Sequence, residues 1–407
     1  MAVNLPDLLP LYPIAGIKVG TACAQIKQPE RDDLALFELS PKSTCAVVFT
    51  RNAFCAAPVI VARQHFAATT PRYLLINSGN ANAGMGERGL NDALYCCEAV
   101  AELGGCAVNE VLPFSTGVIG EPLPVEQIGA VMPAALMALD AQGWEKAAHA
   151  IMTTDTAPKG ESIQAYIDDY TVTVTGIVKG AGMIKPDMAT MLAFIATDVA
   201  VEASVLQTCL ARALDESFHR ITVDGDTSTN DACVLIATAQ NSLPPIKSTR
   251  DSGYSLLCQA ISHVCRQLAK KIVRDAEGAT KFITIDVEQG RSQKECLDVA
   301  YTIAHSPLVK TAFFASDANW GRILAAVGRA GIENFDIKAV KIYLGNVCLV
   351  ENGGVAESYT EEQGQRVMRE PEIKVRVLLG KRGTCQETVF TSDLSHDYVR
   401  INAEYRT

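Results

Sequence analysis

The chain has 407 residues, of which 48% are apolar and 20% charged, an ordinary globular composition with enough length for two or three domains or one large α/β unit. Its net charge of −10 argues against a nucleic-acid or acidic-membrane partner, since both need clustered Lys and Arg. No apolar run reaches about 18 residues and the first residues, MAVNLPDLLPLYP, lack a basic and apolar leader, so we expect neither a membrane span nor a signal peptide.

Short β-branched runs alternate with helical stretches along the whole chain, which predicts an α/β fold with α+β layers. The expected strands are Ala46–Thr50, Tyr73–Asn77, Tyr170–Val178, Met191–Thr197, Cys233–Ala237, Phe282–Val287, Val340–Tyr343 and Ile373–Leu379. The expected helices are Asn91–Leu103, Val125–Asp140, Val201–Ser217, Ser255–Ala269, Ser306–Phe314 and Trp320–Val327.

Two segments interrupt this alternation. Gly176–Pro186 is rich in glycine and proline, and Asn241–Gly253 is a polar connection that contains two prolines. Neither has the length or composition of a flexible linker. We therefore expect the two halves of the chain to interleave rather than to form separate units.

The cysteines and histidines favour no metal site. The thirteen cysteines are an odd number without a CxxC pair, which is typical of reduced thiols in a cytoplasmic protein, packed as small apolar groups. The six histidines are scattered, with no HExxH and no His/Cys cluster at ligand spacing. We expect no metal ion.

The pattern GxGxxG occurs at Gly84, Gly86 and Gly89, with Glu110 about twenty residues later. This spacing invites a dinucleotide-binding interpretation. However, six residues separate the expected strand from Gly84, and Glu110 follows a helix and a Gly-Gly turn rather than a second strand. The pattern therefore supports a dinucleotide-binding oxidoreductase only weakly.

The segment Asp224–Asp231, DGDTSTND, is acidic enough to suggest a calcium loop. An EF-hand would require Gly at its sixth position and Glu at its twelfth, where this chain has Thr229 and Leu235. The dense Asp, Ser, Thr and Asn content instead predicts a tightly hydrogen-bonded loop that is able to line a site.

Phe114–Gly120, FSTGVIG, places a threonine and a glycine in what we interpret as a turn. Such a pair is common in ordinary turns. It is also suited to an oxyanion hole, because glycine permits close approach of the backbone and a hydroxyl can point at developing charge. The second interpretation requires a nucleophile nearby.

A candidate nucleophile lies at the step from Ala189 to Thr190, within KGAGMIKPDMATMLAF. Most threonines at such positions simply open a strand. Cleavage before Thr190, however, would uncover an α-amino group with a pKa of about 7.7–8.0, beside a hydroxyl nucleophile that the amine can activate. The same hydroxyl can attack the preceding carbonyl and release the chain at Ala189.

The segment around Thr190 resembles the cleavage-site signature of the ornithine acetyltransferase family, the glutamate N-acetyltransferases of the cyclic arginine pathway. Further segments agree with this family along nearly the whole chain: TRNAFCAAPV at 50–59, NSGNANAGMG at 77–86, STGVIG at 115–120, DGDTSTND at 224–231, SDANWGRI at 316–323 and YVRINAEYRT at 398–407. The resemblance implies an αββα sandwich of the DmpA/ornithine acetyltransferase type, close to N-terminal-nucleophile hydrolases in chemistry more than in topology.

The resemblance also implies self-cleavage into an α chain, 1–189, and a β chain, 190–407, that interleave in one catalytic unit and assemble as an α₂β₂ heterotetramer. Thr190 would take acetyl from N²-acetylornithine and pass it to glutamate in a ping-pong reaction without a cofactor. Thr116 and Gly117 would form the oxyanion hole. The implied substrate contacts are Thr153, Lys179, Thr190, Glu277, Asn402 and Thr407.

The main alternative is a self-processing N-terminal-threonine aminopeptidase or amidase, in which water takes the acyl group. A dinucleotide enzyme or a non-catalytic binding protein is the more distant one. Members of the family with and without use of acetyl-CoA share the same site residues. The sequence therefore leaves open whether acetyl-CoA is also a donor, and it is silent on feedback by arginine or ornithine.

Overall fold

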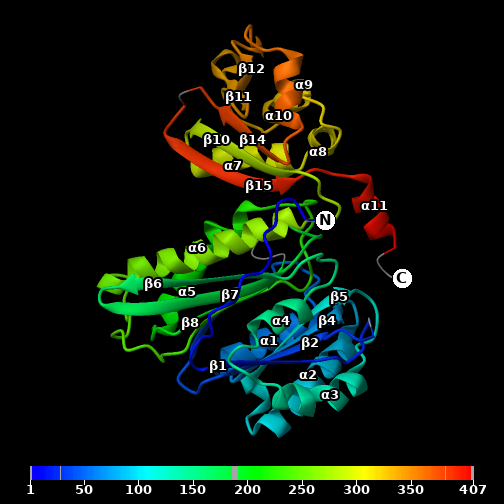
Figure 1. Cartoon of the computed structure of the whole chain (residues 1–407), viewed down its shortest axis with the longest axis vertical. Coiled ribbons are helices and arrows are strands. Elements are labelled where there is room, and N and C mark those ends of the chain that lie inside the picture. Colours follow the sequence, from blue (N-terminus) through cyan, green and yellow to red (C-terminus); the bar gives the residue numbers. More distant parts are fainter. Residues whose placement is uncertain (1, 28, 186–190, 381, 405–407) are drawn as a thin grey trace.

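The computed structural model describes residues 2–27, 29–185, 191–380 and 382–404. In Figure 1 its strands form three sheets, with the last third of the chain at the top. The first sheet has the order β1 (Ile17–Ala22), β2 (Leu34–Leu39), β4 (Tyr73–Asn80) and β5 (Val111–Val118). The second has the order β3 (Thr44–Phe49), β9 (Ala232–Ala237), β8 (Leu192–Thr197), β7 (Tyr170–Lys179) and β6 (Lys159–Ile167).

The first two sheets pack face to face through a buried apolar layer. The ring of Phe194 in β8 stacks on Phe37 of β2 at 5.4 Å and meets Phe114 of β5 edge-on at 5.3 Å. Trp144, which opens α4 (Trp144–Ala150), closes this layer against Phe37. Strands buried on both faces read as continuous apolar runs, as LAFIAT in β8 and ACVLIA in β9 do.

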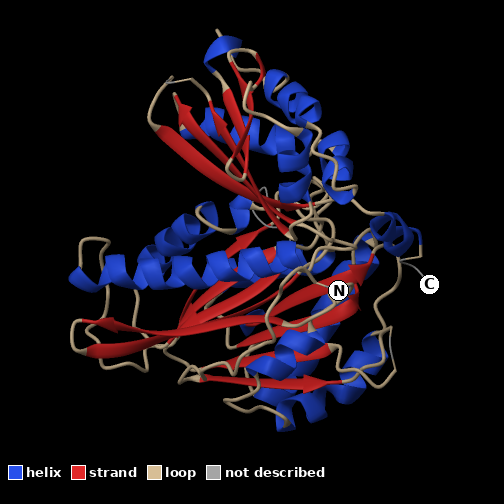
Figure 2. Cartoon of the chain, turned by 45° about the horizontal axis from the view of Figure 1, so that its top comes forward, coloured by secondary structure: helices blue, strands red, loops and turns tan. Residues whose placement is uncertain are grey.

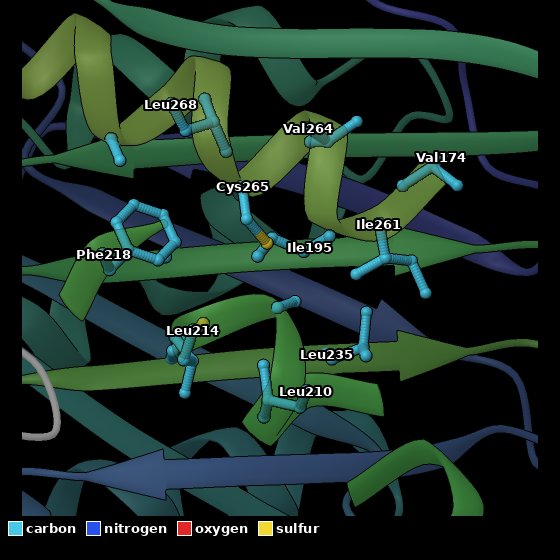
Figure 3. Packing of buried hydrophobic residues seen from close by; sticks show 14 of the residues in the cluster. Val174, Ile195, Leu210, Leu214, Phe218, Leu235, Ile261, Val264, Cys265 and Leu268 are labelled. Atoms are coloured by element: carbon cyan, nitrogen blue, oxygen red, sulfur yellow. The ribbon is translucent and has the colours of Figure 1, made fainter. Parts of the chain in front are cut away.

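Helices cover the two outer faces of this pair of sheets. α2 (Gly86–Gly104) and α3 (Val125–Met137) pack on the first sheet. α5 (Ala203–Asp215) and α6 (Ser252–Arg274) pack on the second. Figure 3 shows this second contact, with Ile261 and Leu268 of α6 facing Ile195 of β8. The order helix, sheet, sheet, helix confirms the expected αββα sandwich.

The second sheet combines strands from both halves of the chain. β8 pairs with β7 in antiparallel and with β9 in parallel register, and β9 pairs with β3. Thus β3, β6 and β7 come from before residue 190, whereas β8 and β9 come from after it. Each half of the chain lacks strands that complete this sheet.

The third sheet has its own core and stands beside α6 (Figure 2). Its order is β13 (Gly354–Val355), β12 (Val347–Glu351), β11 (Lys341–Leu344), β14 (Glu372–Leu378), β10 (Phe282–Gly290) and β15 (Cys385–Ser392). The helices of this unit are α7 (Gln293–Ala304), α8 (Pro307–Phe314), α9 (Trp320–Gly328) and α10 (Glu361–Met368). A bidentate pair between Arg274 of α6 and Glu372 of β14 connects it to the sandwich.

After β15 the chain leaves the third sheet and forms α11 (His396–Ala403), which returns toward the sandwich (Figure 1). Ser395 caps this helix by accepting a hydrogen bond from the N–H of Tyr398, and its own hydroxyl donates to the carbonyl of Gly278 at 2.6 Å. α11 therefore docks on the loop between α6 and β10. None of the helices in the described parts of the chain is long and apolar enough to span a bilayer.

Candidate active site

Thr116 and Gly117 lie in β5 and not in the turn expected from the sequence. The strand is irregular here because its register with β4 shifts at Gly79 and Asn80. Gly117 has φ +138°, and a Cβ on it would lie 2.2 Å from the carbonyl carbon of Gly79. Only glycine fits where the two backbones cross. This requirement explains why FSTGVIG has the composition of a turn although it lies in a strand.

A cavity of about 210 Å³ opens beside this crossing, and we call it the Thr116 cavity. Its walls come from the ends of β5 and β7, the loop after α4, the loop before β9, the loop after α6, and α11. Six of the expected site residues line it: Thr116, Gly117, Thr153, Lys179, Glu277 and Asn402. Ala189, Thr190 and Thr407 lie outside the described residues, but Met191, which directly follows Thr190, also lines the cavity.

Lys179 is the last residue of β7, and its ammonium group points across the cavity to β5. Its Nζ donates a hydrogen bond to the hydroxyl oxygen of Thr116 at 3.1 Å. Burial lowers the pKa of Lys179 from its usual value, and the nearby carboxylate of Asp155 opposes that effect. The site therefore holds a desolvated cation next to the expected oxyanion residues.

A fully buried ion-pair cluster supports this wall of the cavity. Lys159 Nζ lies 2.6 Å from the carboxylate of Asp155 and 2.5 Å from that of Asp275. Burial disfavours the charged forms of both residues, but the attraction between the opposite charges outweighs it. The pKa of Asp155 is therefore lowered, chiefly by Lys159, and the pKa of Lys159 is raised by the carboxylates of Asp155 and Asp275. Asp155 also accepts hydrogen bonds from the N–H of Thr153 at 2.9 Å and of Gly180 at 2.8 Å, so one carboxylate positions both loops.

Glu277 places a carboxyl group in the lining of the Thr116 cavity. Glu277 is only 7% exposed, and a Cβ on Gly182 would lie 2.4 Å from its carboxyl carbon. Asn402 of α11 donates a hydrogen bond to its carboxylate at 2.7 Å. Glu277 is thus fixed between the glycine-rich loop and the C-terminal helix, opposite the cation of Lys179.

The DGDTSTND segment is a hydrogen-bonded loop that lines the Thr116 cavity, as its composition predicts. Ser228, Thr229, Asn230 and Asp231 line the cavity. The side-chain amide of Asn230 donates to the carbonyl of Ser115 at 2.9 Å, which binds the loop to β5. Asn230 carries no local sequence signal of a site residue, because its role depends on contact with a strand 115 positions earlier.

Asp224, at the start of the same segment, holds the chain that leads toward Thr190. Its carboxylate accepts hydrogen bonds from the N–H groups of Met183 at 2.6 Å and of Ile184 at 2.9 Å. It also accepts one from the hydroxyl of Tyr398 in α11 at 3.2 Å. Asp224 is therefore a positioning residue that connects the glycine-rich loop to α11.

The glycine pattern at Gly84, Gly86 and Gly89 lies between β4 and the first turn of α2. Gly89 is required for packing, since a Cβ there would lie 2.7 Å from the side-chain oxygen of Asn82. Asn82 in turn donates to the carbonyl of Gly89 at 2.8 Å. These contacts explain why residue 89 is a glycine, and no bound nucleotide is needed for that explanation.

Comparison with known proteins places the chain in a family. The ArgJ family model matches residues 18–407. The chain belongs to the ArgJ family. This confirms the resemblance expected from the sequence motifs.

Two curated members of the ArgJ family are similar to this chain over nearly its full length. A protein of Pseudomonas syringae named "Arginine biosynthesis bifunctional protein ArgJ" is 56% identical over 407 residues and 100% of both chains. A protein of Methylococcus capsulatus with the same name is 58% identical over 404 residues, which is 99% of this chain and 98% of that one. A solved structure of an arginine biosynthesis bifunctional protein from Bacillus halodurans is 36% identical, covers 53% of this chain and 99% of its own, and has a TM-score of 0.50.

Proposed function

We propose that this chain is an acyltransferase of arginine biosynthesis that moves acetyl from N²-acetylornithine to glutamate. Membership of the ArgJ family and the names of its relatives supply the pathway. The observation that carries the reaction is the Thr116 cavity, which combines an oxyanion-type backbone crossing, the half-buried ammonium group of Lys179 and the buried carboxylate of Glu277, with Met191 in the same lining.

The nucleophile of the proposed reaction is Thr190 after cleavage of the Ala189–Thr190 bond. The next residue, Met191, lines the cavity, and its carbonyl accepts the N–H of Ala232 at 3.0 Å, which fixes the start of β8 there. The exposed α-amine, with a pKa of about 8, would serve as the base.

In the first half-reaction, the Thr190 hydroxyl oxygen attacks the acetyl carbonyl while the α-amine takes the hydroxyl proton. Thr116 and the backbone at Gly117 would receive the charge of the tetrahedral intermediate. Its collapse returns the proton to the departing amine of ornithine and leaves an acetyl ester on Thr190. In the second half-reaction, the glutamate amine attacks this ester and regenerates the hydroxyl. No external cofactor is needed for these steps.

The charges of the cavity fit the proposed donor. Lys179 would pair with the α-carboxylate of acetylornithine, and Glu277 would receive its side-chain ammonium. Asn402 holds the Glu277 carboxylate in place, and Thr153 lies on the loop fixed by Asp155. We propose Thr407 as a further substrate contact from the family resemblance alone.

Processing is tested first, by denaturing electrophoresis. We expect two fragments, with the sequence TMLAF at the start of the second, and a single intact chain for Thr190→Ala. One band of 43.6 kDa from the unaltered protein would contradict processing.

Acetyl transfer is tested by steady-state kinetics. Parallel lines in double-reciprocal plots with acetylornithine and glutamate would support the ping-pong scheme. Acetate release without acetylglutamate would instead favour the amidase alternative.

The name "bifunctional" on the curated relatives favours a second donor for this chain, acetyl-CoA. Acetylation of glutamate from acetyl-CoA in the absence of acetylornithine tests this directly.

We also propose assembly of two processed units as α₂β₂. Light scattering of the processed protein would show about twice the mass of one unit.

A further inference from the structure

The loop that carries Glu277 is held at both of its ends. We call residues 277–281 the Glu277 loop, and it lies between α6 and β10. At its start, the N–H of Glu277 donates to the carbonyl of Ala181 in the glycine-rich loop at 3.0 Å. At its end the loop meets Asp393, which follows β15 and is only 3% exposed. Two segments that are distant in sequence therefore fix the Glu277 loop.

Asp393 binds the end of the Glu277 loop with both of its carboxylate oxygens. Its Oδ1 accepts hydrogen bonds from the N–H of Thr280 at 2.8 Å and from the N–H of Lys281 at 3.1 Å. Its Oδ2 accepts a hydrogen bond from the hydroxyl of Thr280. Because a carboxylate binds two adjacent residues in this way, it fixes the direction in which the chain leaves Glu277.

The chain after Asp393 contacts the middle of the same loop. The hydroxyl of Ser395 donates to the carbonyl of Gly278. Gly278 has φ +66°, and a Cβ on it would lie 2.6 Å from the hydroxyl oxygen of Ser395 and 2.6 Å from the backbone nitrogen of Tyr398. Only glycine fits between the loop and the first turn of α11. The Asp393 and Ser395 contacts therefore hold the start of α11 against the loop.

Two buried lysines of the third-sheet unit have Asp393 as their counter-charge. The Nζ of Lys310 in α8 donates to the hydroxyl of Thr391 at 3.0 Å and to the carbonyl of Ser392. The Nζ of Lys281 donates to three consecutive carbonyls at the end of α10. Burial lowers the pKa of both lysines, to about 8 for Lys310, and the carboxylate of Asp393 opposes the shift in each. The third-sheet unit thus holds Asp393 in place.

The position of Glu277 decides which side chain the Thr116 cavity can select. A hydrogen bond between an ammonium group and a carboxylate is strong at about 2.7–2.9 Å and weakens when either group moves. Asn402, which holds the Glu277 carboxylate, lies on α11, and Ser395 holds the start of that helix. The backbone of Glu277 and the amide that orients its carboxylate therefore both depend on the chain at Asp393 and Ser395.

We propose that Asp393 is a positioning residue that determines the preference of the site for an acyl donor with a side-chain ammonium group. Asp393 is not among the described residues that line the Thr116 cavity, so it acts through Glu277. This inference rests on the proposed function, in which Glu277 receives the ammonium group of acetylornithine. The third-sheet unit then contributes to donor selection, although its own core lies outside the sandwich.

The test compares acetylornithine with acetylnorleucine, in which a methyl group replaces the ammonium group, as acetyl donors to glutamate. In Asp393→Ala we expect the ratio of kcat/KM for acetylornithine to that for acetylnorleucine to fall about tenfold, because a charge-assisted contact is displaced. Asp393→Asn should keep most of the ratio, since an amide can still accept from both N–H groups and donate to the hydroxyl oxygen of Thr280.

A milder variant and a control accompany this pair. Thr280→Val removes only the hydroxyl bond to Asp393, and we expect a fall in the ratio of about threefold. Asp286→Ala is the matched control, because Asp286 is a carboxylate of the same sheet that accepts from Thr388 at 2.6 Å and lies away from the Glu277 loop. It should leave the ratio unchanged.

A ratio in Asp393→Ala equal to that of the control would overturn the proposal, and so would an equal loss of kcat/KM for both donors, which indicates general damage. A fall in Asp393→Asn as large as in Asp393→Ala would also contradict it, because the hydrogen bonds that the amide keeps are then not what matters. If Asp393→Ala does not fold, Thr280→Val decides alone, and an unchanged ratio there rejects the role. Failure of the proposed function differs: the unaltered protein would release no ornithine from acetylornithine.

Discussion

The two walls of the Thr116 cavity are built differently. One wall consists of strand ends, with Thr116 and Gly117 on β5 and Lys179 on β7, where sheet hydrogen bonds fix the backbone. The other consists of loops and α11, with Glu277 and Asn402 held to each other by side-chain hydrogen bonds. Backbone hydrogen bonds of the sheets therefore place the groups of the first wall, which we call the strand wall, whereas side-chain contacts between distant segments place those of the second, which we call the loop wall.

The strongest test removes the cation of the buried ion-pair cluster, whose Asp155 positions the loops of Thr153 and Gly180. Lys159→Met would leave the carboxylates of Asp155 and Asp275 buried without their cation. We expect a loss of about 3–5 kcal/mol in the free energy of unfolding, measured by urea denaturation. The control Lys294→Met breaks an exposed pair with Asp298 and should change little. Equal effects of the two variants would show that the buried cluster does not support the site.

The strand wall is tested on its own by Gly117→Ala. The added methyl group would lie 2.2 Å from the carbonyl carbon of Gly79 and would force β5 and β4 apart. We expect kcat to fall about 10²- to 10³-fold, as it does on loss of an oxyanion donor. Gly328→Ala is the control, because nothing lies within 4 Å of its added Cβ. Activity near that of the control would remove the backbone crossing from the reaction.

The loop wall is tested by Asp224→Asn, which keeps the size of the side chain but turns one acceptor into a donor that faces an N–H group. Met183 or Ile184 then loses its hydrogen bond to this side chain. We expect processing to slow about tenfold, equivalent to one charge-assisted hydrogen bond, when followed by electrophoresis of newly made protein. Asp226→Asn, an exposed change in the same loop, should process at the normal rate.

The smallest expected effect is on the pH dependence of stability, and it concerns His305. Burial, assisted by the cations Lys185 and Lys310 and by Arg329 and opposed by Asp224, lowers the pKa of His305 to about 4. Its ring nitrogen Nε2 lies 3.0 Å from the hydroxyl oxygen of Thr222, and the O–H of Thr222 donates a hydrogen bond to the carbonyl of Ile184.

Because the folded pKa of His305 is lower than the ordinary value of 6.5, the unfolded chain binds the proton first as the pH falls. The stability contributed by neutral His305 is therefore complete above about pH 6.5 and is lost between pH 6.5 and about 4. His305→Gln should remove about 1–2 kcal/mol of that pH dependence, with the discount appropriate to a partly exposed group. The exposed His263→Gln is the control, and identical pH profiles for both variants would reject this role.

Sequence periodicity located the elements whose local pattern is strong. The expected strands at Met191–Thr197 and Cys233–Ala237 agree with β8 and β9 to within one residue, because both are continuous β-branched or apolar runs. Among the expected helices, Trp320–Val327 differs from α9 by one residue. By contrast, α11 has the sequence HDYVRINA, whose apolar residues define no buried face, and the pattern did not predict it.

The site was predictable only in part from the residues themselves. Glycine in FSTGVIG signalled an unusual backbone, but it was interpreted as a turn, since the contact with Gly79 that creates the crossing is not visible locally. Glu277 and Asn402 entered only through the family resemblance, because a carboxylate and an amide separated by 125 positions form no local pattern. The Asp224 contacts depend in the same way on two distant segments.

The composition of the second sheet limits what can be exchanged between molecules. Because β9 pairs with β3 and β8 pairs with β7, a cut before residue 190 would leave two fragments joined along two strand interfaces. Mixing two processed variants at room temperature would therefore not give hybrid molecules. A processed protein would keep the two fragments with which it was synthesised, and the product of one cleavage would remain a single folding unit throughout its lifetime.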